Sequence, residues 1–191
     1  MRDVTGVDEA AQHLLSCVTE SLNATAAELE NVRLGAPCRA CVAPGEVIHV
    51  CPPACGHRNA THAPGQLTVS LVRMGPYTTF PSIASNIDVS CEPTGYAAEL
   101  LVTLLRCAPS SSQAGPPACD KLADTAQLVH IDAVSIHRAL KCCVPTRPGR
   151  TRKTKVAPTG HRVIGPAGGC VGNEVRVVID LGGLCPCEAA S

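Results

Sequence analysis

The chain of 191 residues has almost no aromatic side chains: it contains no Trp, one Phe and two Tyr. Aromatic residues bury more apolar area per side chain than any others. Without them the core must be assembled from Val, Leu, Ile and Ala, each of which contributes about 1.5–3 kcal/mol or less when buried. Sixteen Pro and sixteen Gly interrupt regular structure further. Small cores of this kind are commonly reinforced by covalent cross-links.

A dominant charge and a long apolar run are missing as well. Sixteen basic and sixteen acidic residues give a formal net charge of zero, so the chain has no overall field for nucleic acid or for an anionic membrane. No stretch approaches the ~20 apolar residues of a membrane-spanning helix. The polar beginning of the chain lacks the apolar core of a signal peptide. Either a signal peptide has been removed, or the protein is cytosolic and its cysteines bind metal.

Cysteine, by contrast, is abundant, with thirteen residues. Because disulfides persist in oxidising compartments, this number predicts a secreted, extracellular protein whose cysteines are mainly structural. Asn23 and Asn59 each begin an Asn-X-Thr triplet, the pattern of N-glycosylation, and are predicted glycosylation sites. Two unmodified polar triplets are the alternative interpretation.

Three segments follow one another along the sequence. Residues 1–35 form a predicted helical segment, because apolar residues recur at spacings of three and four from Val7 to Val32. Asp8 and Glu9 favour the start of this helix, which we expect to span residues 7–33. Residues 36–66 hold four cysteines and five prolines and are predicted to be a cross-linked connector. Residues 67–191 are predicted to form a β-rich domain.

Alternating apolar and polar residues predict the strands of this domain at 67–72, 87–91 and 175–181. Two apolar runs, 99–105 and 131–140, fit either strand or helix, and β-branched residues favour strand in the second. Stretches rich in Pro, Gly and Ser are predicted linkers at 108–118, 144–151 and 157–169. The expected fold is mainly β with long loops, preceded by an N-terminal α-helix.

The most specific motif lies at the end of the chain. Cys170 is followed by fourteen residues and then by Cys185-Pro186-Cys187. In an extended segment residues i and i+2 point to the same face, so both thiols can reach a neighbouring strand together. If Cys91 is the partner of Cys185, the closed loop spans about 95 residues, and the chain-entropy estimate for its stabilisation is ~4–5 kcal/mol.

This ending resembles the interleukin-17 cytokines, whose last strand runs into a Cys-X-Cys pair with another cysteine fourteen residues earlier. Phe80-Pro81-Ser82-Ile83 followed by Cys91 resembles the family's segment before its first knot cysteine, and residues 133–137 loosely resemble an intervening strand. The resemblance covers residues 76–188. The chain departs from the family at Tyr96, where a second knot cysteine is expected, and it lacks the family's Trp.

The resemblance implies a cystine-knot-like antiparallel β domain. Cys185 and Cys187 would be knot cysteines, Cys91 would be a candidate partner for Cys185, and Cys187 would pair with Cys107 or Cys119. Cys170 would cross-link two chains, which also suits an odd number of cysteines. The family function would be that of a secreted, signalling ligand that binds a cell-surface receptor as a homodimer. Cys142-Cys143-Val144-Pro145 also resembles the transforming-growth-factor-β ligands, although their spacing to the terminal pair is shorter.

The remaining cysteines are further disulfide candidates: Cys17, Cys38, Cys41, Cys51, Cys55, Cys142 and Cys143. Four of them, Cys38, Cys41, Cys51 and Cys55, also have a spacing close to that of a zinc ribbon. In a chain with nine other cysteines we expect them to form disulfides, and therefore no resident metal or other cofactor.

One basic cluster interrupts the neutral chain, at Arg147, Arg150, Arg152, Lys153 and Lys155. It is either a solvated loop or a contact for an acidic receptor surface or a sulfated glycan. No catalytic constellation is visible, so an enzyme is not expected. A receptor-binding ligand is the first hypothesis, an extracellular structural or envelope-type protein that assembles with partner chains is the second, and a zinc-binding interaction module is the third.

Overall fold

The structure is a computed structural model that describes residues 6–45, 63–84, 95–109, 115–146, 153–167 and 169–183. In chain order these residues form α1 (Gly6–Glu28), a short 3-10 helix η1 (Val32–Leu34), β1 (Pro37–Ala43), β2 (Ala63–Tyr77), β3 (Gly95–Cys107), α2 (Cys119–Cys142), β4 (Val156–Ala167) and β5 (Cys170–Gly183).

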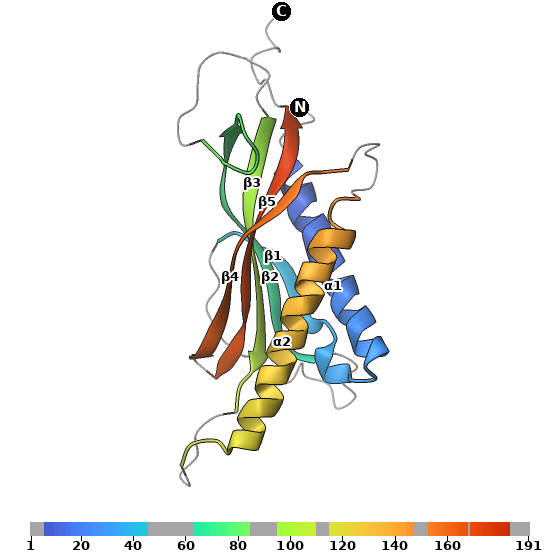
Figure 1. The fold of residues 1–191 in the computed structure, drawn as a ribbon, viewed down its shortest axis with the longest axis vertical. Coiled ribbons are helices and arrows are strands. Elements are labelled where there is room, and N and C mark those ends of the chain that lie inside the picture. Colours follow the sequence, from blue (N-terminus) through green and yellow to red (C-terminus); the bar gives the residue numbers. More distant parts are fainter. Residues whose placement is uncertain are drawn as a thin grey trace, which may run out of the picture.

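The strands form one five-stranded sheet in the order β1-β2-β3-β5-β4 (Figure 1). β1 runs parallel to β2, and the other neighbouring pairs are antiparallel. The prediction of a mainly β protein with an N-terminal helix is confirmed, but the sheet is mixed. The cystine knot itself stays a prediction, because Cys91, Cys185 and Cys187 lie outside the described residues.

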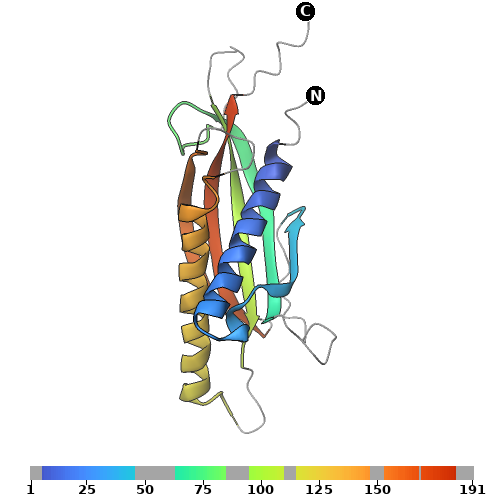
Figure 2. The same ribbon diagram turned by 90° about the vertical axis from the view of Figure 1, so that its right-hand side faces the viewer.

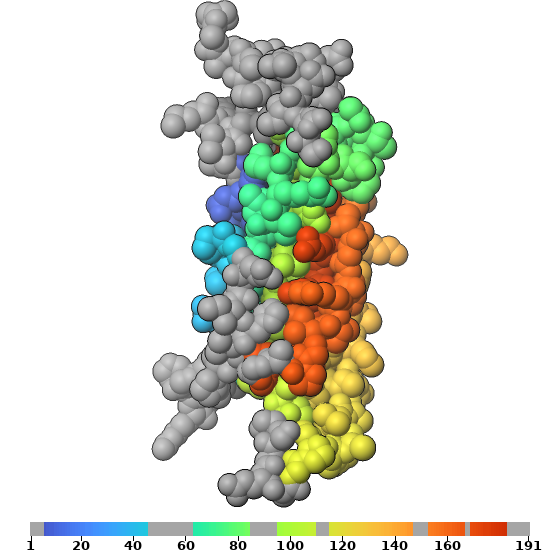
Figure 3. All heavy atoms as spheres, turned by 90° about the vertical axis from the view of Figure 1, so that its left-hand side faces the viewer, coloured from blue at the N-terminus to red at the C-terminus, as the bar shows by residue number. Residues whose placement is uncertain are grey.

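Both long helices cover the same face of the sheet (Figure 2). They run in opposite directions, with α1 packed mainly on β2 and β1 and α2 on β5 and β4. Figure 3 shows the other face, on which side chains of β2 to β5 reach the surface. The molecule is therefore a two-layer arrangement of helices on a sheet.

The core lies between the two layers and contains aliphatic side chains throughout. Alternate residues of β3, such as Leu100 and Val102, point to the helices, as do Val175 and Val177 of β5. Leu14, among other residues of α1, packs against them. The three sequence segments thus contribute to one core, built from small apolar residues as the composition predicts.

Two expectations about local structure are wrong. Residues 131–140 lie within α2, not in a strand, and most of the predicted linker 157–169 is strand β4. The buried positions of α2 do recur at helical spacing, but they include Asp132 and Ser135, which hides the apolar stripe in the sequence. β4 is an edge strand, where proline is tolerated because one side of the backbone has no ladder partner.

Candidate functional site

The contact between α1 and α2 begins with a disulfide. Cys17, near the middle of α1, is bonded to Cys143 at the carboxyl end of α2, 126 residues later, with a Cα–Cα distance of 5.7 Å. Both were disulfide candidates, and this pairing confirms a disulfide for each. His13 lies one helical turn before Cys17, with its Nε2 3.6 Å from the Cys17 Sγ.

Hydroxyl groups continue the contact along the helices. Ser21 donates to the backbone oxygen of Ser135 at 2.8 Å, and the Ser135 hydroxyl donates to the Thr25 hydroxyl at 2.9 Å. Thr25 in turn donates to the Ser21 backbone oxygen. Because small hydroxyl side chains satisfy one another here, the two helices approach closely and hold a defined register.

Beyond the hydroxyl groups the helices border an open groove of about 330 Å³. Its lining residues come from both helices: Thr25, Glu28, Leu29, His130, Ile131, Val134, Ser135 and Arg138. Leu29 is 53% exposed and Val134 is 69% exposed. Val32 of η1, directly after α1, is 72% exposed. Apolar side chains of this size are therefore open to solvent at one end of the helical layer.

Opposite charges flank this groove. Arg138 of α2 donates two hydrogen bonds from Nη1 to the Glu28 carboxylate of α1, at 2.8 and 2.9 Å. Both side chains are about half exposed, so this pair contributes little to stability within one chain. An apolar surface with a charged border is the composition of a protein-docking site.

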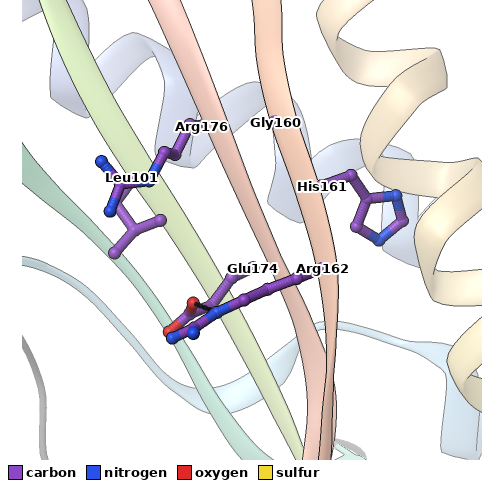
Figure 4. Close-up of a pocket in the computed structure, with 6 residues that line it drawn as sticks. All are labelled: Leu101, Gly160, His161, Arg162, Glu174 and Arg176. Atoms are coloured by element: carbon purple, nitrogen blue, oxygen red, sulfur yellow. Dashed lines mark hydrogen bonds and ion pairs between the residues drawn. The ribbon is translucent and has the colours of Figure 1, made fainter.

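A second, smaller pocket of about 180 Å³ lies on the sheet face away from the helices (Figure 4). It contains an ion pair between Arg162 of β4 and Glu174 of β5, which stand directly opposite each other in the sheet. Nearby, Glu99 of β3 pairs with Arg73 at 2.6 Å and with Arg176 at 3.7 Å. Each buried carboxylate has an Arg partner, so these pairs serve strand register.

A histidine pair connects α2 to β4 on the helical side. Asn173 donates from Nδ2 to the Val129 backbone oxygen, so its Oδ1 faces His161 Nε2 at 2.9 Å and must accept from it. His161 Nδ1 is then an acceptor, 3.4 Å from His137 Nε2. Burial and the neighbouring His161 lower the pKa of His137.

The other predicted cysteines differ in state. Cys38 and Cys107 are disulfide-bonded, whereas Cys41, Cys119 and Cys142 are free thiols. Cys170, predicted to join two chains, is fully buried, and burial raises its pKa. Among the described residues, the exposed thiols are those of Cys119 and Cys142. Cys51 and Cys55 lie outside the described residues, as do Cys91, Cys185 and Cys187. Because Cys38 is disulfide-bonded, it offers no thiolate to the four-cysteine zinc site in this structure.

The surface predictions fall partly on described residues. Asn23 lies within α1, where its Oδ1 accepts from the Ala36 backbone, and the Thr25 of its triplet is buried against α2. Lys155 of the basic cluster lies 5.6 Å from the centre of the Tyr77 ring, and Lys153 is exposed. Asn59, Arg147, Arg150 and Arg152 lie outside the described residues.

The groove was not predicted. Leu29 and Val32 belong to the apolar stripe of the first helix, and the sequence signal assigned them to its buried face. α1 ends at Glu28, however, and both side chains emerge from the layer. The signal available in the sequence was the apolar stripe itself, because it continues past the last turn of α1 to Leu29 and Val32.

Comparison with protein-family models found no match, and a search of curated proteins found no similar sequence. Among the described helices, none combines the length and the apolar character that a membrane crossing requires.

Proposed function

We propose that this chain is a non-enzymatic structural protein that assembles with a second copy of itself through its helical layer. The groove between α1 and α2 forms the centre of that interface. The observation that carries the proposal is the exposure of Leu29 and Val134 in one groove with a charged border. Single exposed apolar residues are ordinary on protein surfaces, but a cluster of them beside a groove is typical of an interaction site.

The charges on the two sides of the groove support a symmetric partner. A twofold interface uses the same patch on both copies, so the patch must complement itself. Glu28 lies on one helix and Arg138 on the other. A twofold axis through the groove therefore brings Glu28 of each copy towards Arg138 of the other copy. The exposed ion pair within each chain is then replaced by two ion pairs between the chains, which the interface shields from solvent.

The size of the helical layer is adequate for such a contact. Helices of 23 and 24 residues are about 35 Å long, and two of them side by side are about 20 Å wide, which gives roughly 700 Å² per copy. A standard interface buries about 800 Å² per partner. Burial of the exposed parts of Leu29 and Val134 in both copies contributes roughly 4–7 kcal/mol. That energy only offsets the lower estimates of the cost of association, about 4 kcal/mol. A micromolar dissociation constant corresponds to a net of about −8 kcal/mol, so the rest of the helical layer must contribute to the dimer as well.

Sedimentation velocity at several protein concentrations tests this function. We expect the wild-type chain to form a dimer whose population rises with concentration, and Val134→Asp to be monomeric throughout. Leu122→Asp is the matched control, since Leu122 is an exposed apolar residue at the other end of α2, far from the groove, and it should weaken the dimer much less than Val134→Asp does. A monomeric wild-type chain, or equal dimerisation of all three proteins, contradicts the proposal.

A secreted receptor ligand, the function implied by the interleukin-17 resemblance, is the second candidate. The disulfide between the two helices favours it, because a covalently braced surface loses less conformational entropy on binding. Peptide mapping of the disulfides tests it. Cys185 and Cys187 must bridge to two different strands. A Cys185–Cys187 bond or two free thiols would contradict the interleukin-17 hypothesis. Receptor contact through the basic cluster, or through a sulfated glycan, belongs to this candidate.

A further inference from the structure

We propose that the disulfide between the two helices has a second chemical state. When the Cys17–Cys143 bond is reduced, its two sulfurs and the His13 imidazole bind a zinc ion. The three potential ligand atoms all lie within 4.8 Å of one another. They come from two elements, since His13 and Cys17 lie on α1 and Cys143 follows α2. This site is separate from the four-cysteine set that the sequence suggests.

The geometry on α1 already suits a tetrahedral ion. His13 and Cys17 are four residues apart, so they lie above one another on the same helix face. With Zn–S near 2.3 Å and Zn–N near 2.0–2.1 Å, tetrahedral ligands are separated by about 3.6 Å from sulfur to nitrogen. The observed distance from Cys17 Sγ to His13 Nε2 is 3.6 Å. The spacing of these two ligand atoms therefore already fits a zinc ion. Because His13 Nδ1 lies 3.9 Å from the same sulfur, the imidazole must turn so that Nε2 faces the ion.

The third ligand needs only a small movement. Two sulfurs on a tetrahedral zinc ion lie about 3.8 Å apart, so the Cys143 sulfur must move back from its bonded position. Cys143 is the C-cap of α2, held by a backbone hydrogen bond to Ala139, and a terminal residue can shift without displacing the helix. A solvent molecule can complete the coordination, because His13 and Cys143 are partly exposed.

The electrostatics also favour the ion. Reduction by a dithiol transfers two electrons and two protons to the disulfide and leaves two thiols, while the dithiol becomes a disulfide. Zinc binding then releases both thiol protons to solvent. Two thiolates and one divalent ion give a neutral site. Cys17 is 1% exposed, and a neutral cluster is tolerated there, whereas two unpaired thiolates are not. Soft thiolate ligands select zinc over magnesium or calcium.

This second state would keep α1 and α2 joined whether the surroundings are oxidising or reducing. The disulfide links the helices in the first case and the metal links them in the second. The inference does not depend on the proposed dimer, because the Cys17–Cys143 disulfide and the groove are different parts of the contact between the helices.

Zinc stoichiometry of the full-length chain provides the test. The protein is reduced with a phosphine, which converts the disulfide to two thiols while the phosphine takes up oxygen from water, and it is then titrated with zinc chloride under inert gas. Other reduced cysteines can also bind zinc, so the informative quantity is a difference. We expect Cys17→Ser/Cys143→Ser to bind one equivalent less than the wild type, and the control Cys119→Ser, which lacks an exposed thiol of α2, to bind the wild-type amount.

A second variant guards against loss of folding. His13→Gln retains the disulfide and should fold like the wild type when oxidised. After reduction we expect its affinity for the corresponding zinc ion to fall at least about tenfold, since loss of even an outer-shell partner has an effect of that size. Equal zinc content in the double variant and the wild type, or an unchanged affinity in His13→Gln, would overturn the proposal.

Discussion

Replacement of Arg106 by Met is predicted to be the most damaging single change to the buried polar network. Arg106 is 3% exposed, and Asp132, on α2, is completely buried. The guanidinium donates two hydrogen bonds to the Asp132 carboxylate, at 2.9 and 2.8 Å. It donates two more to the backbone oxygens of Gly35 and Leu34. One side chain thus ties β3 to α2 and to the segment that follows α1.

The magnitude follows from what the Met variant leaves behind. Removal of one partner of a buried ion pair costs about 3–5 kcal/mol, and each of the two carbonyls left without a donor adds about 1 kcal/mol. The expected loss is about 5–7 kcal/mol, which is comparable with the whole stability of many domains. The double variant Arg106→Met/Asp132→Leu removes both charges and leaves only the two carbonyls. It should therefore regain about 3 kcal/mol relative to Arg106→Met alone.

The assay is urea unfolding without reductant, followed by far-ultraviolet circular dichroism because the chain has no Trp. The pH dependence adds an independent check. Burial raises the pKa of Asp132, and Arg106 lowers it, so loss of Arg106 must raise it further. A raised carboxyl pKa favours the folded state at low pH and loses that contribution as pH rises, so the Met variant should lose less stability in acid than at neutral pH. A loss under about 1 kcal/mol, or a double variant no more stable than Arg106→Met, would refute this reasoning.

Three further predictions concern separate parts of the molecule. Cys143→Ser opens a loop of 126 residues and should lower the free energy of unfolding by up to about 5 kcal/mol in urea without reductant; a loss near zero would contradict a structural staple. His137 has a lowered pKa in the folded chain. The stability that its neutral form contributes is therefore fully present above the pKa of the unfolded chain, near ~6.5, and is lost as the pH falls. His137→Gln should therefore unfold with less pH dependence between neutral and acid solution, and an unchanged profile would contradict the histidine pair. A methyl group on Gly172 would collide with the Leu104 backbone oxygen, so Gly172→Ala should lose at least about 2 kcal/mol. Gly165→Ala, where the added carbon meets nothing within 4 Å, is the control, and equal midpoints would contradict the packing described.

Local patterns in the sequence account for much of the fold. The stripe from Val7 onward predicts α1, and the alternating residues 67–72 and 175–181 lie within β2 and β5. These segments bury one face against a single partner layer, and the periodicity of their apolar residues therefore appears directly in the sequence. The scarcity of aromatics likewise predicts an aliphatic core reinforced by cysteine.

What could not be predicted depends on contacts between distant segments. Asp132 is buried only because Arg106 neutralises it, and this pairing conceals the helical pattern of α2. Cys17 was a disulfide candidate, yet nothing in the sequence selects Cys143 among the other cysteines as its partner. The groove arises because Val134 of α2 lies beside the end of α1, an arrangement that neither helix encodes alone.

Position-specific cross-linking tests the central claim, self-assembly through the helical groove, most directly. In a background with Cys119→Ser and Cys142→Ser, which removes the exposed thiols among the described residues, Val134→Cys places a thiol beside the proposed twofold axis and Leu122→Cys places one far from it. Mild oxidation should convert the first variant to a species of twice the 19.7 kDa chain mass on a non-reducing gel, well before the second. Equal rates in the two variants, or no cross-linked species from Val134→Cys, would contradict the proposed assembly.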